Sequence, residues 1–164
     1  MKKIFFLICA VALFQNADAQ SKFTLDGNQL VLPSPIEFQT GSDKVKPSSI
    51  DVLMHIKAYL EEKTYISTLR IEVHTDDEGD AAYKQTLTEK RALYIGRWLV
   101  SQGIDCKRLI CVGFGSNKPV ADNSTPQGKA LNRRVAVVNA GLRGRLIGGM
   151  PADGGGLVAG DVCK

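Results

Sequence analysis

The spacing of apolar residues switches between two periods along the middle of the chain, and this switching limits the fold more than any other feature. Residues 69–74 alternate apolar and polar side chains, which is typical of a strand with one buried face. Residues 47–62 instead repeat apolar side chains at a period near 3.6, which predicts a helix that begins at Pro47. Strands that alternate with helices are expected to form a sheet covered by helices.

The remaining elements continue the same alternation. Asp80 is a favourable N-cap for a second helix that runs to about Ser101, on which Tyr94 and Trp98 fall at core spacing. A short helix is expected around 128–132. Four strands are expected, at 36–38, 69–74, 109–113 and 133–139. We therefore predict an α/β two-layer sandwich, with a four-stranded mixed sheet and helices packed on one face.

The first residues of the chain are typical of a secretory signal. Residues 1–19 combine a basic start, an apolar run and an Ala-x-Ala pattern, so Gln20 would begin the mature protein. The apolar run of about eleven residues is too short to cross a hydrocarbon core of ~30 Å, which argues against a retained anchor. Lipidation at Cys9 is a further alternative, but Cys9 precedes most of the apolar run. No later segment is apolar enough to predict a membrane span.

Two further boundaries follow from composition. Residues 20–35 are expected to form a short lead-in, in which 26–28 make a turn between two extended pieces. Eight of the sixteen glycines lie in residues 141–164. Because such a segment buries too little apolar surface to offset its loss of conformational entropy, a flexible C-terminal tail is predicted. The folded domain is then expected to cover residues 36–140.

Three cysteines would remain after removal of the signal: Cys106, Cys111 and Cys163. Their number is odd, so at least one stays free or pairs between molecules. Cys106 and Cys111 can meet only if the chain turns between them, and Cys163 could reach either one. The pairing therefore stays open. No CxxC pair or second ligand cluster accompanies the cysteines, so neither a zinc site nor another cofactor is expected.

Charge and motif content exclude other functions. The formal net charge is only +4 and the charges are interspersed, whereas nucleic-acid-binding proteins concentrate basic residues on one face or arm. Asp76, Asp77 and Glu78 are adjacent, and they do not supply the separated carboxylate pair that glycoside hydrolysis needs. No nucleophile-elbow or phosphate-loop motif occurs. We therefore expect neither a nucleic-acid partner nor an enzyme.

The loop after the strand at 69–74 carries the strongest candidate site. Asp76 lies where a strand ends and a helix begins, a position at which backbone N–H groups gather. Lys84 and Arg91 are seven residues apart on that helix and share one of its sides. Asp76 could accept from an ammonium group while Arg91 grips a carboxylate. The alternative is that Asp76 caps a turn and Arg91 forms a surface ion pair worth ~0–1 kcal/mol.

Taken in order, the motifs of the chain resemble the OmpA-like family, which includes Pal-type lipoproteins and flagellar stator proteins. The resemblance covers residues 36–138. It is carried by Ile36-Glu37-Phe38 with Gly41-Ser42, His74-Thr75-Asp76 with Gly79, Tyr83 with Leu87-Thr88 and Arg91-Ala92, Gly113-Phe114-Gly115, Asn123-Ser124-Thr125 with Gly128, and Asn132-Arg133-Arg134-Val135.

This resemblance implies a function. In the family, the matching aspartate and arginine hold the free amino-acid end of diaminopimelate in the peptidoglycan stem peptide, which implies that role for Asp76 and Arg91. Five further residues are candidates for the ligand site: Thr75, Lys84, Asn132, Arg133 and Arg134. The implied function is non-covalent binding of peptidoglycan, which anchors or links an envelope component to the cell wall. The expected location is the bacterial periplasm, in association with the cell wall or the outer membrane.

Two positions depart from the family pattern. Val73 replaces the glycine before His74, and Lys84 replaces the asparagine after Tyr83. A lysine offers a long cation where an asparagine offers both a donor and an acceptor. The alternative function is therefore a structural subunit of an envelope or secretion complex, which keeps the fold and binds a protein partner through the lead-in or the tail.

Overall fold

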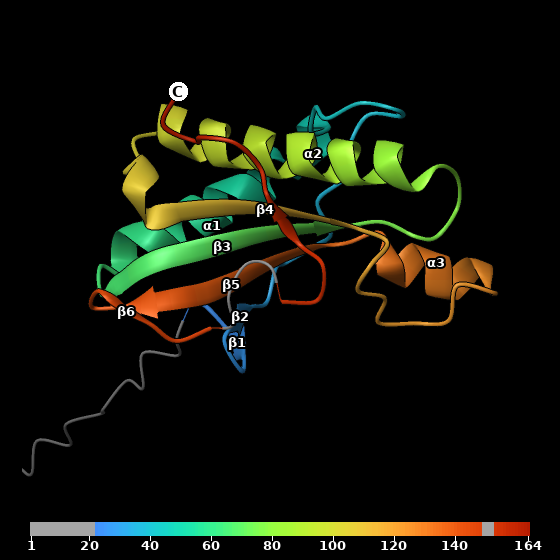
Figure 1. Cartoon of the computed structure of the whole chain (residues 1–164). Helices are drawn as coiled ribbons and strands as arrows, with labels where there is room; N and C mark the ends of the chain where they lie inside the picture. The colour runs from blue at the N-terminus through green and yellow to red at the C-terminus, as the bar shows by residue number, and fades with distance from the viewer. Residues whose placement is uncertain (1–21, 149–152) are drawn as a thin grey trace, which may run out of the picture.

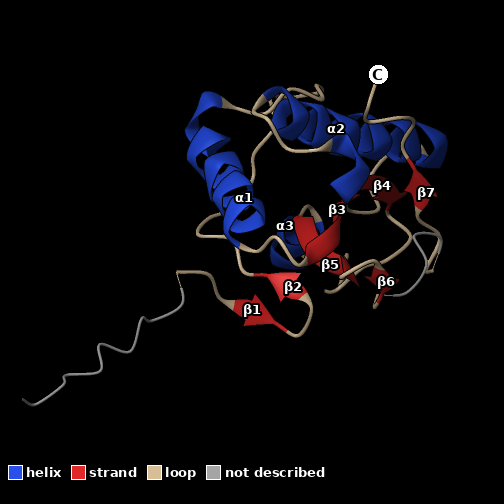
Figure 2. Ribbon diagram, turned by 90° about the vertical axis from the view of Figure 1, so that its left-hand side faces the viewer, coloured by secondary structure: helices blue, strands red, loops and turns tan. Residues whose placement is uncertain are grey.

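A mixed sheet with two long helices packed on one face forms the centre of the molecule (Figures 1 and 2). The computed structural model describes residues 22–148 and 153–164, so the predicted signal peptide and Cys9 lie outside the described residues. The strands are β1 (Leu25–Asp26), β2 (Gln29–Leu30), β3 (Ile66–His74), β4 (Leu109–Gly115), β5 (Val135–Leu142), β6 (Arg145–Leu146) and β7 (Leu157–Val158). The helices are α1 (Ile50–Glu62), α2 (Ala81–Ser101) and α3 (Pro126–Asn132), with short 3₁₀ turns η1 (Pro47–Ser49) and η2 (Cys106–Arg108).

Strand β3 lies at the middle of the sheet. It pairs in parallel with β4 and antiparallel with β5, and the strand order is β1-β2-β5-β3-β4-β7. Leu69, Ile71 and Val73 alternate along β3 and are almost completely buried in the main core cluster, with residues from α1 and α2. The alternation predicted from sequence therefore identifies the face of β3 that the helices cover.

Local sequence signals explain where the helices begin. The predicted helix at 47–62 is confirmed, since η1 starts at Pro47 and continues into α1. Asp80 caps α2, because its side chain accepts a hydrogen bond of 2.7 Å from the backbone N–H of Tyr83. Thr125 caps α3 in the same way, so that helix begins slightly earlier than the sequence predicted.

The number of strands differs from the prediction. Among the described residues the sheet has seven strands rather than four. Residues 36–38 do not form one of them; only Phe38 makes an isolated bridge, with Val45. The backbone N–H of Glu37 donates to Ser49 Oγ at 2.9 Å, so it is not available to a neighbouring strand. The additional strands are short and come from the lead-in and from the residues after β5.

The lead-in forms the predicted turn between two extended pieces. β1 and β2 pair antiparallel around Gly27, whose φ of 56° suits a residue without a side chain. Phe23 packs edge-on against the rings of His55 and Tyr59, at centroid distances of 4.9 and 5.2 Å. These contacts hold the start of the described chain against α1.

Residues 153–164, called the C-terminal segment below, differ from the predicted flexible tail. β7 pairs with the outer edge of β4, and the N–H of Ala159 donates to the carbonyl of Cys111 at 2.8 Å. A disulfide between Cys106 and Cys163 closes the segment onto η2. The pairing of β7 with β4 and the disulfide offset the loss of conformational entropy on ordering this segment. The prediction from glycine content had taken only that entropy loss into account. Cys111 is left free and buried.

None of the helices in residues 22–148 and 153–164 is long and apolar enough to cross a membrane.

Candidate ligand-binding site

A cavity of about 530 Å³ opens at the carboxyl end of β3. Its walls come from the loop before η1, from α2, and from the chain between α3 and β5. Its titratable lining residues are Glu37, Lys46, His74, Arg91, Arg133 and Arg134. Lys46 and Glu37 pair with each other at 3.0 Å, so the remaining cationic side chains of the lining are the three arginines.

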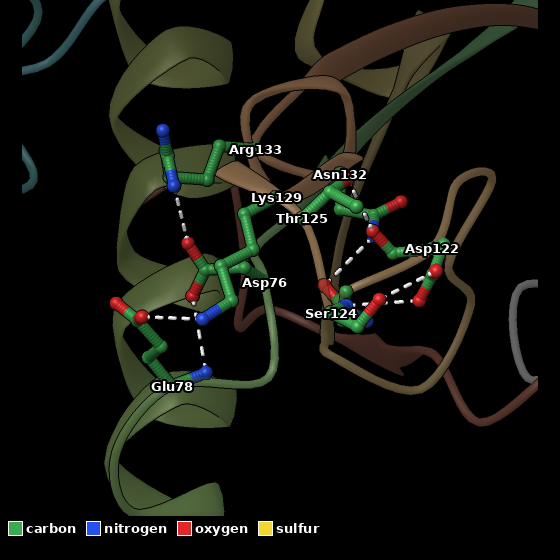
Figure 3. A network of polar contacts seen from close by, with 9 residues as sticks. Asp76, Glu78, Asp122, Ser124, Thr125, Lys129, Asn132 and Arg133 are labelled. Carbon is green, nitrogen blue, oxygen red and sulfur yellow. Dashed lines mark hydrogen bonds and ion pairs between the residues drawn. The ribbon is translucent and has the colours of Figure 1, made fainter. Parts of the chain in front are cut away.

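Asp76 is not one of the residues that line the cavity, but it is paired with Arg133, which does line it. One carboxylate oxygen of Asp76 is 2.5 Å from Arg133 Nη1, and the other accepts from the backbone N–H of Glu78 at 3.2 Å (Figure 3). The Asp76 side chain is 8% exposed, whereas that of Arg133 is 52% exposed. Asp76 therefore caps its own loop, as one alternative proposed, and also fixes an arginine at the cavity.

Arg91 reaches the cavity from α2. Its Nε donates to the carbonyl of Ser42 at 3.0 Å, and its guanidinium lies 4.5 Å from the centre of the Phe38 ring. Burial lowers the pKa of Arg91 from its usual value, although Tyr83 and Asp43 act in the opposite direction. Arg91 forms no ion pair with any described carboxylate, so the predicted surface pair is absent from this part of the chain. Its charge stays available to an anionic ligand.

The loop of Asp76 is tied to its surroundings on two sides. The N–H of Thr75 donates to the carbonyl of Gly115 at 2.9 Å, so this amide is already used by β4. Lys129 of α3 forms an ion pair with Glu78, which Figure 3 draws as a dashed line; the two charged atoms are 2.5 Å apart. Sequence reasoning missed Lys129, because only the fold brings α3 beside this loop.

Asn132 is a buried residue that stabilises the neighbouring loop. It is fully buried, and its Oδ1 accepts from the amides of Val120 and Ala121 at 2.8 and 3.0 Å. Its Nδ2 donates to Ala121 O and Asn123 Oδ1, both at 2.8 Å. Every hydrogen-bonding position of the amide is therefore used to brace residues 120–123.

The other two candidates differ from each other. Lys84 is 7% exposed and forms no ion pair within the described residues. Arg134 donates from Nη2 to the carbonyl of Lys118 at 3.2 Å, while its buried Nη1 has no hydrogen-bond partner among the described residues. Burial lowers the pKa of Arg134, and Glu72 acts to raise it.

A buried ionic network supports the strand that leads to Asp76. On the face of β3 opposite to the helices, Glu72 lies 2.6 Å from Arg70 and 3.3 Å from His74 Nε2. Burial acts to raise the pKa of Glu72, but the hydrogen bond from His74 and the nearby Arg70 outweigh it, so the pKa is lowered. Burial lowers the pKa of His74, which stacks on Phe114 at 4.7 Å. The end of β3 is thus fixed just before the candidate site.

The comparisons with known proteins agree on one family. A family model described as the OmpA family matches residues 37–133. Outer membrane porin F of Pseudomonas aeruginosa is 38% identical over 101 residues, which are 61% of this chain and 29% of the porin. The outer-membrane lipoprotein YfiB of the same organism is 34% identical over 113 residues, which are 69% of this chain and 67% of YfiB. The chain thus spans less than a third of the porin's length.

The fold comparison points the same way. The crystal structure of the peptidoglycan-associated lipoprotein from Burkholderia pseudomallei matches with a TM-score of 0.56 and 28% identity. The match covers 63% of this chain and 86% of that structure. The C-terminal segment lies beyond the residues that the family model matches.

Proposed function

The chain belongs to the OmpA family, and from this premise we propose that its cavity binds bacterial peptidoglycan without covalent chemistry. The ligand part would be the free amino-acid end of diaminopimelate in the stem peptide. This end carries an ammonium and a carboxylate at a fixed separation. A site for it needs one anionic and one cationic group on neighbouring elements.

One observation carries the proposal: Arg91 faces the cavity without a carboxylate partner among the described residues, beside the Asp76–Arg133 pair. The guanidinium of Arg91 would bind the ligand carboxylate through paired N–H groups. The ammonium would bind Asp76, and the half-exposed Arg133 would swing from the carboxylate toward the ligand. Exchange of one ion pair for another keeps Asp76 neutralised throughout.

Reversible binding of this kind would tether the protein to the cell wall. We place the mature protein in the periplasm, in association with the wall or the outer membrane. The printed names of its relatives, an outer membrane porin, an outer-membrane lipoprotein and a peptidoglycan-associated lipoprotein, support this placement.

Sedimentation with purified cell-wall sacculi tests the proposal. The wild type should pellet with sacculi, and Asp76→Ala and Arg91→Ala should each stay in the supernatant while the circular dichroism spectrum is unchanged. Asp77→Ala is the matched control for the acidic loop, and Lys107→Ala is the control for loss of an exposed cation, since both residues are exposed. Pelleting of both site variants at the wild-type level would overturn the assignment of these two residues.

A second candidate function is supported by two features of the same site. Asp76 already holds Arg133, and Lys84 stands where the family pattern has asparagine. Under this alternative, the domain keeps the fold and binds a protein of an envelope or secretion complex. A wild type that does not pellet with sacculi, but forms a specific cross-link to an envelope protein, would favour the alternative over peptidoglycan binding.

A further inference from the structure

A second cavity, of about 550 Å³, lies along the outer side of α2. Lys90, Tyr94, Arg97 and Trp98 line it from successive turns of the helix, and their spacing puts them on one face. Asp43 lines it from the loop before η1. The sequence indicated Tyr94 and Trp98 as core residues, and both do pack against the core. However, both are only half-buried and also line this second cavity.

The charged groups of the second cavity have spare hydrogen-bonding capacity. Within the part of the chain that the structure describes, Asp43, Lys90 and Arg97 form no ion pair and no side-chain hydrogen bond. Lys90 and Arg97 are exposed donors on α2, and Asp43 is an acceptor on the loop before η1. Two aromatic rings flanked by unpaired donors and an acceptor suit a ligand that is both flat and rich in hydroxyl groups.

The two cavities are neighbours that share a wall. Gly41 lines the cavity beside Arg91, and Asp43 lines the second cavity. Between them, the carbonyl of Ser42 accepts from Arg91 Nε at 3.0 Å, which holds the dividing loop against α2. On the helix itself, Lys90 and Arg91 are consecutive and each belongs to a different cavity. A polymer that branches could therefore occupy both cavities at once.

We propose that the second cavity binds the glycan strand of peptidoglycan, while its stem peptide occupies the first cavity. This proposal rests on the proposed function. The apolar C–H face of a sugar ring would stack on Tyr94 and Trp98. Lys90 and Arg97 would donate to hydroxyl and acetamido oxygens, and Asp43 would accept from a hydroxyl. The glycan is held by hydrogen bonds and ring contacts, so high salt should weaken this part of the binding less than the stem-peptide part.

Calorimetry with two soluble ligands separates the two cavities. The first ligand is a stem tripeptide that ends in diaminopimelate, and the second is the same peptide linked to its disaccharide. The wild type should bind the disaccharide-linked peptide about tenfold more tightly than the free peptide. Tyr94→Leu/Trp98→Leu, which keeps apolar bulk against the core, should bind both ligands equally, with unchanged affinity for the free peptide. Tyr65→Leu is the control for loss of an exposed aromatic ring elsewhere.

Each outcome decides a specific claim. Equal affinity of the wild type for the two ligands would overturn the glycan proposal and leave the proposed function intact. Binding of neither ligand would overturn both. If the leucine variant also loses the free peptide, Lys90→Gln/Arg97→Gln decides, because both side chains are exposed and their change leaves the core intact. A preserved preference for the disaccharide in that variant would overturn the proposal.

Discussion

The cavity end of the molecule and the C-terminal segment are held in place by opposite means. At the cavity end, loops are joined by ion pairs such as Asp76–Arg133 and Glu78–Lys129, in which one partner remains largely exposed. The C-terminal segment is instead held by backbone pairing of β7 with β4, by Val162 against α2, and by a disulfide.

This difference separates binding from stability. Half-exposed ion pairs contribute little to the free energy of unfolding, and their groups can exchange partners with a ligand. Backbone pairing, apolar packing and a covalent link contribute more, and they offer a ligand nothing to exchange with. We therefore expect that changes at the cavity end alter binding, and that changes at the C-terminal segment alter stability.

Loss of the disulfide should have the largest effect. Cys106 and Cys163 are 57 residues apart. Loop-closure entropy then predicts that Cys106→Ser/Cys163→Ser loses about 4 kcal/mol of unfolding free energy. Urea unfolding measures this, and sedimentation with sacculi should be unchanged below the transition. Identical unfolding curves for the wild type with and without a reducing agent would contradict the expectation.

Loss of the buried network of Arg70, Glu72 and His74 should have the second-largest effect on stability. Glu72→Ala removes the buried carboxylate that Arg70 and His74 share, which should cost about 3 kcal/mol. Glu62→Ala is the matched control, because Glu62 pairs with Lys63 while half-exposed and should change stability by only ~0–1 kcal/mol. Similar urea midpoints for the two variants would show that the network contributes no more than a surface pair.

Much of the fold could be predicted because its signals are local. The alternation along residues 69–74 identified the buried face of β3, and Asp80 marked the start of α2 through a contact only three residues away. Local signals also made Asp76 and Arg91 candidate site residues, and the resemblance to the OmpA-like family implied their role. A short loop and a helical period fix their positions relative to the strand end.

The remaining features depend on contacts between distant parts of the chain. The glycine content of residues 141–164 predicted a flexible tail, and this prediction was wrong for residues 153–164. Composition does not reveal that β7 can pair with the edge of β4, or that Cys163 lies within reach of Cys106. The ion-pair partner of Asp76 could not be predicted from the sequence either, since Arg133 lies 57 residues further along the chain. Neither the hydrophobic pattern nor the residue spacing of a sequence can predict a contact that forms only when the sheet has assembled.

Acid should lower the free energy of unfolding in two stages. The decrease should be smaller than that caused by the substitution Glu72→Ala. Burial holds the pKa values of His55 and His74 below 6.5, so below that pH the unfolded chain binds protons that the folded chain does not. The lowered pKa of Glu72 adds a second loss as the pH falls from 4.5 through the lowered value. Urea midpoints between about pH 7 and pH 5 should fall in the wild type and stay level in His55→Gln/His74→Gln. An unchanged slope in that variant would assign the first stage to other groups.

The smallest effect on stability is expected where the effect on binding is largest. Asp76→Asn keeps an oxygen that can accept from the N–H of Glu78, and it frees Arg133, whose side chain is 52% exposed to water. The unfolding free energy should therefore change by no more than about 1 kcal/mol, and less at high salt, while sedimentation with sacculi is lost. A loss of stability as large as that of Glu72→Ala would show that Asp76 is a structural residue of the loop. The contrast between a binding end and a stabilising segment would then fail at its most informative position.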